Sequence, residues 1–170
     1  MEVNYKKSVC LRIGFRFNYE CSPVITCDGH ILNWVQQFRY LGVFIDSASL
    51  FRCDFSDRKK AFYRSFNSIF GRVGRNASPE VIIELVKKKC LSLLLYASEV
   101  LPFSSSGYKS LDYVFNCAIR KVFSISSNDA VAYCREIFSI SPVRDIISDR
   151  HNVFLFRLAK LDMLLGVVWS

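Results

Sequence analysis

The N-terminal part of the chain carries short runs of apolar and polar positions that are typical of β-strands. Residues 7–17 alternate weakly with a period of two, which predicts a half-buried strand that ends at Gly14. Two further β-forming runs flank Asp28-Gly29, a dipeptide that strongly favours a hairpin turn. Residues 38–45 form the densest run and predict one strand. Because no helix long enough for a parallel crossover separates these runs, we predict a small antiparallel sheet.

From Ser56 onward the apolar positions recur at helical spacing instead. A second helix is predicted to begin at Ser78-Pro79, a capping hydroxyl followed by proline, and to run to about Tyr96. Within it, residues 91–95 are apolar nearly all round and should form the most buried helical turn of the molecule. The remaining apolar stripes predict three more helices, with stripes over residues 111–122, 131–138 and 143–165. Ser126-Ser127-Asn128 is predicted to cap the second of them, and Ser141-Pro142 to open the third.

Together these patterns predict an α+β fold, in which a small N-terminal antiparallel β-hairpin sheet is followed by an α-helical bundle. We place the divisions at residues 1–55, 56–100 and 101–170, because Pro102 and the Ser-rich stretch 104–107 interrupt the helical pattern. A chain of 170 residues is long enough for one good core, or for two small lobes that share one.

The net charge of +8 favours a polyanionic partner. Between Ser56 and Cys90 lie nine basic and three acidic residues, so one fifth of the chain holds most of the excess. The alternative reading of this segment is a solvated helix face that a neighbouring domain balances.

The seven cysteines are not arranged as metal ligands usually are. The nearest group, Cys21, Cys27 and His30, lacks a fourth ligand, so we expect no zinc site. Scattered cysteines in apolar patterns favour a reducing compartment. The N-terminus lacks a signal-peptide pattern, and the longest apolar run, residues 90–97, is too short to span a membrane. We therefore expect an intracellular protein, cytoplasmic or nuclear, with no membrane partner.

The segment Phe38-Arg39-Tyr40-Leu41-Gly42 resembles the primer grip of reverse transcriptases, and more narrowly that of LINE-type (non-LTR) retrotransposons. The primer grip is the hairpin that presses on the 3′ end of the primer, so the resemblance implies that all five residues contact nucleic acid. Their chemistry suits this role, with a cation and backbone amides for phosphates and aromatic edges against sugars. The glycine would permit close approach of the backbone to the ligand.

Residues 4–14 resemble the LINE segment in which Lys-Ser and a hydrophobic strand follow the catalytic turn. The resemblance implies that Lys7 lies near the triphosphate of the incoming nucleotide, whereas the residues alone also fit an edge-strand lysine in solvent. Residues 59–67 resemble the first thumb helix, and residues 94–99 the Leu-Leu-Tyr-Gly segment after the thumb, with Ala97 in place of glycine. Nucleic-acid contacts are therefore also expected of the basic residues at the start of the thumb, namely Arg58, Lys59, Lys60 and Arg64.

The resemblance covers nearly the whole chain in the family's order, with residues 110–116 and 131–136 similar to the connector. It implies a palm remnant at 1–55, thumb-like helices at 56–100 and a connector at 101–170. The intact enzyme would be an RNA-directed DNA polymerase with Mg²⁺ held by paired carboxylates. This sequence contains no Asp-Asp pair. We therefore expect a fragment that is inactive alone, without catalytic residues, cofactor or metal, whose partners are the primer–template duplex and the missing palm and fingers portion.

Two other classes of protein remain open at this point. One is a small basic helical nucleic-acid-binding protein without enzyme ancestry, which the charge distribution alone would fit. The other is a protein-interaction module that uses exposed aromatic residues, since fifteen phenylalanines are many for this length. An upstream reading frame that encodes an Asp-Asp strand would favour the polymerase hypothesis over both.

Overall fold

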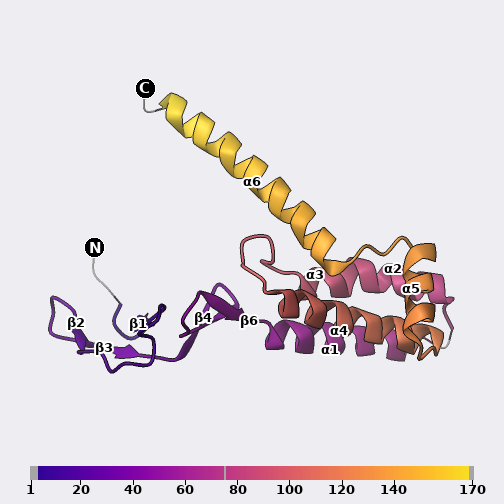
Figure 1. Cartoon of the computed structure of the whole chain (residues 1–170), viewed down its shortest axis with the longest axis horizontal. Coiled ribbons are helices and arrows are strands. Elements are labelled where there is room, and N and C mark those ends of the chain that lie inside the picture. The colour runs from indigo at the N-terminus through magenta and orange to yellow at the C-terminus, as the bar shows by residue number, and fades with distance from the viewer. Residues whose placement is uncertain (1–3, 75, 169–170) are drawn as a thin grey trace. The chain divides into compact units, whose positions relative to one another are not determined.

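A computed structural model describes residues 4–74 and 76–168, with side chains described as far as residue 161. The chain divides into two compact units, Met1–Phe55 and Ser56–Ser170. The first contains the strands and the second the helices (Figure 1). The α+β fold class predicted from the sequence is therefore confirmed, as is the change from strands to helices at Ser56.

The first sheet contains β1 (Val9–Cys10), β2 (Val24–Ile25) and β3 (Ile31–Trp34) in the order β1-β3-β2. Strands β2 and β3 form the predicted antiparallel hairpin, and Gly29 in its loop has a φ of +81°. The short β1 pairs with β3 in parallel, because the hairpin returns β3 in the direction of β1. The predicted strand from residue 7 to Gly14 is wrong outside Val9–Cys10, although the chain does turn at Gly14, whose φ is +128°.

The second sheet contains β4 (Gln37–Tyr40), β5 (Val43–Asp46) and β6 (Arg52–Asp54), all antiparallel in the order β4-β5-β6. The prediction of one strand over 38–45 is wrong, because the chain reverses at Leu41-Gly42 and the two halves pair with each other. Both turn residues have positive φ, 47° and 79°. A tight two-residue hairpin turn requires positive φ at both of its residues if its twist is to match that of the flanking strands.

The two faces of this sheet differ in character because successive side chains of a strand alternate between them. One face carries Val43, Ile45 and Cys53, and both Val43 and Cys53 are buried. The cross-strand register gathers polar side chains on the opposite face, with Phe44 among them. These polar residues are Gln37, Arg39, Asp46, Arg52 and Asp54.

The helical unit begins with α1 (Ser56–Val73) and a second rod built from α2 (Pro79–Leu85), η1 (Val86–Cys90) and α3 (Leu91–Leu94). The η1 segment is one π-helical turn, so the rod is continuous from the predicted start at Pro79. Ser78 does not cap this helix as predicted, because its hydroxyl instead binds the Glu80 carboxyl and lowers the pKa of that group.

The unit continues with α4 (Ser105–Phe123), α5 (Asn128–Ile137) and α6 (Val143–Val168). The side chains of Ser104 and Ser127 cap α4 and α5 by accepting hydrogen bonds from backbone N–H groups three residues later. Residues 105–107, predicted to lie in a break, thus form the first turn of α4. The start of α5 is at the predicted position.

The core of the helical unit lies between α1, the α2–α3 rod and α4. Phe62 and Phe66 of α1 stack 6.3 Å apart, and Phe62 also contacts Phe115 of α4, with 6.2 Å between ring centroids. The predicted stripe on α4 is buried from Leu111 to Ile119, and Val122 at its end is half-buried. The fully buried apolar side chains of the unit include Phe62, Phe115, Ile82, Ile83, Val86, Cys90, Leu94, Leu95, Leu111 and Ile119.

Two sequence predictions about helical burial need correction. Residues 91–95 are not buried all round, because Leu94 and Leu95 face the core while Leu93 is 40% exposed. Along α6, Val143 and Ile147 are buried as predicted, but Leu158 and Leu161 of the same stripe are exposed. Leu165 lies outside the described side chains. An apolar stripe identifies the face that would pack, yet it does not supply the neighbour that covers it.

Candidate nucleic-acid interface

The β4–β5 hairpin presents its turn to solvent. Leu41 is 74% exposed, and the neighbouring Tyr40 is 59% exposed. A leucine in the left-handed region costs roughly 1–2 kcal/mol relative to ordinary backbone geometry. Such conformations in non-glycine residues cluster at functional sites. The turn therefore holds an apolar side chain in water at a position where glycine or asparagine would be less strained.

Aromatic and basic side chains flank this turn along the hairpin. The rings of Phe38 and Tyr40 lie on one face with 6.2 Å between centroids. On the other face the Arg39 guanidinium lies over the ring of Phe44, 5.8 Å from its centroid. The five residues assigned to nucleic-acid contact by resemblance thus lie on one hairpin, with cation and aromatic edges on opposite faces.

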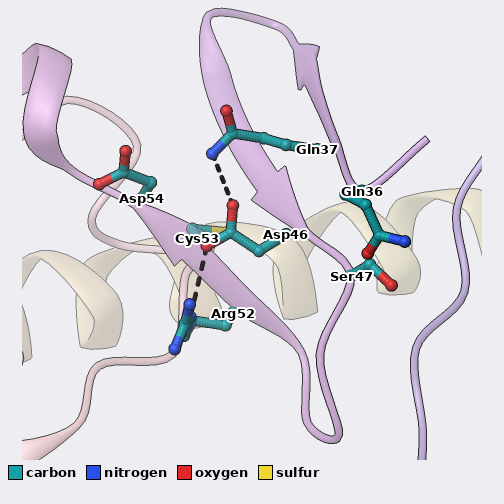
Figure 2. A pocket seen from close by; sticks show the side chains of 7 residues that line it. All are labelled: Gln36, Gln37, Asp46, Ser47, Arg52, Cys53 and Asp54. Carbon is teal, nitrogen blue, oxygen red and sulfur yellow. Dashed lines mark hydrogen bonds and ion pairs between the residues drawn. The ribbon is translucent and has the colours of Figure 1, made fainter. Parts of the chain in front are cut away.

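The open end of the hairpin is fixed by the Asp46 carboxylate (Figure 2). The Gln37 side-chain amide donates to one carboxylate oxygen at 2.6 Å, and Arg52 forms an ion pair with the other at 3.3 Å. The Asp46 carboxylate on β5 is thus bound to Gln37 on β4 and to Arg52 on β6, so it joins all three strands of the sheet. Because both carboxylate oxygens already accept from the chain, Asp46 acts as a structural tie that holds the hairpin on β6.

A hollow of about 440 Å³ lies over this tie, and its lining comes from β4, β5, β6 and the adjoining residues Gln36 and Ser47 (Figure 2). Cys53 borders the hollow, but burial and the nearby Asp46 charge raise the pKa of its thiol. A raised thiol pKa leaves little thiolate at neutral pH, so Cys53 is a poor nucleophile. The sequence patterns did not indicate this tie, because β6 has only three residues and no repeating signal.

Two contacts set the position of α1 against the rod. The Cys90 thiol donates to the Ser65 hydroxyl at 3.4 Å, and the Arg58 guanidinium lies 4.3 Å from the ring centroid of Tyr96. As residue numbers rise on α1 they fall on the rod, so these helices are antiparallel. These contacts and the burial of Phe62 leave Lys60 and Arg64 on the solvent face of α1.

The other side of α1 packs against α4. The Lys59 ammonium donates to the Ser110 hydroxyl at 2.6 Å, and the Lys121 ammonium of α4 donates to the Asn67 side chain at 3.0 Å. Lys121 also lies over the rings of Phe66 and Phe70. Lys59 is thus partly buried against α4, whereas Lys121, which sequence reasoning did not single out, lies at the edge of the basic side of α1.

The remaining cations of the basic segment differ in their surroundings. Lys87 is engaged, with its ammonium 2.7 Å from the Glu84 carboxylate and 3.2 Å from the Phe138 carbonyl oxygen. Lys88 and Lys89 are exposed on η1. Lys7, which lies outside the basic segment, is exposed in a turn just before β1 rather than on the predicted strand. Its backbone N–H donates to the Asn4 carbonyl.

No group of three or more His, Cys, Asp or Glu side chains within residues 4–74 and 76–161 is placed to hold a metal ion. Across the part of the chain that the structure describes, no helix combines the length and hydropathy needed to cross a bilayer. Comparisons with protein-family models, curated proteins and solved structures found no match to this chain.

Proposed function

We propose that this chain is the primer-grip and thumb portion of a LINE-type RNA-directed DNA polymerase and that it binds a primer–template duplex. The observation that carries the proposal is the Gln37–Asp46 hairpin, with Leu41 exposed and strained in its turn. The resemblance implies a hairpin in this segment, although the apolar pattern alone predicted a single strand. A helix with an exposed basic face, α1, follows in the chain after β6.

Binding by the hairpin and by α1, each within its own unit, would rest on phosphate contacts. Lys60 and Arg64 are exposed on α1, and guanidinium and ammonium groups are the usual donors to phosphate oxygens. The hairpin adds the Arg39 cation together with Tyr40 and Leu41, whose apolar surfaces suit contact with a sugar. These contacts carry little sequence information, so the bound duplex is held by its shape and charge.

Catalysis is not expected of this chain alone. Polymerase chemistry needs two metal ions held by paired carboxylates, and this sequence contains no Asp-Asp pair. The Asp46 carboxylate is already bound by Gln37 and Arg52. Purified chain with Mg²⁺, primed template and nucleotides should therefore extend no primer.

A salt titration with matched variants tests the binding proposal. Lys60→Gln combined with Arg64→Gln should weaken duplex binding uniformly across sequences. It should also flatten the dependence of log K on log salt by ~0.9 for each phosphate that the variant no longer neutralises. Lys109→Gln combined with Arg144→Gln removes the same charge from α4 and α6 and serves as the control. Equally weakened binding in the two double variants, or binding that does not depend on salt, would contradict the proposal.

A further inference from the structure

The first sheet of the β-rich unit carries two aromatic rings of β3 on one face. Side chains of a strand alternate between faces, so His30, just before β3, and Trp34, at its end, point to the same side. The hairpin ladder includes His30, because its carbonyl oxygen accepts from the Thr26 N–H at 2.8 Å. His30 is exposed and Trp34 is 39% exposed. We call this side of the first sheet the aromatic face.

Tyr5 and His30 form a stacked pair at one end of the aromatic face. Their ring centroids lie 3.7 Å apart, and the ring planes are inclined by 17°. Tyr5 comes from the turn before β1 and is 36% exposed, and the Lys6 ammonium lies 5.8 Å from the centroid of its ring. Exposed rings with a cation beside them are the combination on which an unpaired base stacks while its phosphate is neutralised.

Trp34 and Arg12 form a second pair at the other end of this face. Cys10 of β1 lies opposite Trp34, and two residues further on the Arg12 guanidinium lies 5.8 Å from the centroid of the Trp34 ring. The indole N–H donates to the Ser22 carbonyl oxygen at 3.1 Å, and the Arg12 guanidinium donates to the Arg16 carbonyl oxygen at 3.1 Å. Because the ring and its cation are already held in place, binding to them costs little conformational entropy.

The spacing of the two pairs favours a single strand over a duplex. His30 and Trp34 are four residues apart along the strand, which corresponds to ~13 Å at ~3.3 Å per residue. Stacked bases of a duplex follow one another at ~3.4 Å along each strand, so each base face is covered by its neighbours. Only the unstacked bases of a single strand can place separate base faces against both pairs.

The charges of this segment favour a polyanion. Residues 4–34 include four basic and two acidic residues. Lys6 and Arg12 lie against the rings themselves. The acids lie outside the strands, Glu20 in the loop before β2 and Asp28 in the β2–β3 turn, and neither belongs to an ion pair among the described residues. The cations are therefore placed where the phosphates of a strand stacked on these rings would run.

We propose that the aromatic face binds single-stranded nucleic acid. One unpaired base stacks on the Tyr5–His30 pair and another on Trp34, and Lys6 and Arg12 neutralise phosphates of the same strand. The site shares no residue with the hairpin and helix proposed to bind duplex, and it does not rest on that function. Base faces and phosphates are common to DNA and RNA, so the aromatic face should bind both.

Fluorescence of Trp34 in a Trp169→Phe background tests base stacking with the full chain. A short oligothymidylate should quench this fluorescence to saturation, and an oligouridylate of the same length should do the same. An abasic strand of equal length and charge should bind weaker by roughly tenfold or more, because stacking contributes that much for each base. Equal binding of the abasic strand, or no saturable quenching by the thymidylate, would overturn the proposal.

Side-chain variants locate the site. Tyr5→Ala combined with His30→Ala should weaken oligothymidylate binding, followed by fluorescence anisotropy, by roughly tenfold. Tyr5→Phe keeps the ring and should bind as the unaltered chain does. Tyr133→Ala removes an exposed ring from α5 and is the control. Tyr5 and His30 are exposed, so unchanged thermal unfolding will show that the double variant folds. Unchanged binding by the double variant, or an equal loss in Tyr133→Ala, would overturn the proposal.

Discussion

Among the described residues, the β-rich unit buries two apolar side chains, Val43 and Cys53, whereas the helical unit buries apolar residues along every helix from α1 to α6. The β-rich unit relies instead on polar ties between distant segments. The Ser47 hydroxyl donates to the Arg12 carbonyl oxygen, and the Trp34 indole donates to that of Ser22. Hydrogen bonds contribute less net free energy than buried apolar area, so the β-rich unit should be the less stable of the two.

The largest expected effect is the loss of a core aromatic in the helical unit. Phe62 is fully buried between Phe66 and Phe115. Phe62→Ala should lower the free energy of unfolding by about 3–5 kcal/mol, because it leaves a cavity in a close-packed core. Urea unfolding followed by circular dichroism measures this change. A decrease below about 1 kcal/mol would show that the core is loosely packed.

A matched valine pair compares the two units directly. Val86 is fully buried in η1, and Val43 is 8% exposed in β5. Val86→Ala should cost about 2–3 kcal/mol and Val43→Ala about 1 kcal/mol, since a thin sheet can relax around the missing methyl groups.

The readout for each valine variant must report on its own unit. Circular dichroism follows the helical unit, and fluorescence of Trp34 in a Trp169→Phe background follows the β-rich unit. An equal loss of unfolding free energy in Val86→Ala and Val43→Ala would contradict the expected difference between the two units.

Alkylation of the cysteine thiols distinguishes the two units by a smaller effect that depends on pH. Burial raises the pKa of both Cys53 and Cys90, with the Asp46 charge adding to the effect at Cys53. A raised thiol pKa means that the folded state holds the proton more tightly than the unfolded state. The stabilisation is therefore full below the ordinary thiol pKa and is lost as pH rises above it. Exposed Cys27 should react first at neutral pH, because the thiolate is the reactive form.

Mass spectrometry of partly alkylated chain then orders the two protected thiols. Cys53 should be labelled before Cys90, because local opening of the β-rich unit is expected to cost less free energy. Raising the pH should bring the alkylation rates of Cys53 and Cys90 closer to that of Cys27. Labelling of Cys90 ahead of Cys53 would reverse the comparison of the two units.

The smallest effect concerns one backbone position. Ala97 has a φ of 59°, in the region that favours glycine. Ala97→Gly should raise the stability of the helical unit by about 0.5–1 kcal/mol, because glycine removes the strain of the left-handed conformation. Ala97→Val should lower it. Thermal unfolding of both variants checks the pair, and a destabilising glycine would show that the Ala97 methyl group contributes more by packing than it costs in strain.

Particular elements show how far the fold follows from sequence. The starts of α1 and α5 were predicted correctly, because helix starts depend on local capping and on the onset of an apolar stripe. The Leu41-Gly42 turn was not, because leucine is not a turn former and the hairpin is stabilised by cross-strand pairing. The π-helical turn η1 has no local signature.

The site was predictable as a segment but not as a surface. The sequence identified the hairpin residues and the basic helix, while the availability of each cation depends on its neighbours. Lys59 donates to Ser110, 51 positions away in sequence, and Lys87 to the Phe138 carbonyl. The exposed seam of α6 was predicted as an apolar stripe, and only the structure shows that its second half lacks a cover among the described residues.

The proposal that the β4–β5 hairpin is a primer grip is tested most directly by binding of the full chain to two DNA duplexes of equal length. One duplex is blunt and the other has a recessed 3′ end. A primer-grip hairpin should favour the recessed end, by about tenfold if it contributes ~1.4 kcal/mol. Leu41→Gly should abolish this preference while easing the strain of the turn, so that the change cannot come from unfolding. Leu50→Gly, at another exposed leucine of the same unit, should leave it unchanged. Equal affinity of the unaltered chain for the two duplexes, or a preference that survives Leu41→Gly, would contradict the assignment of this hairpin as a primer grip.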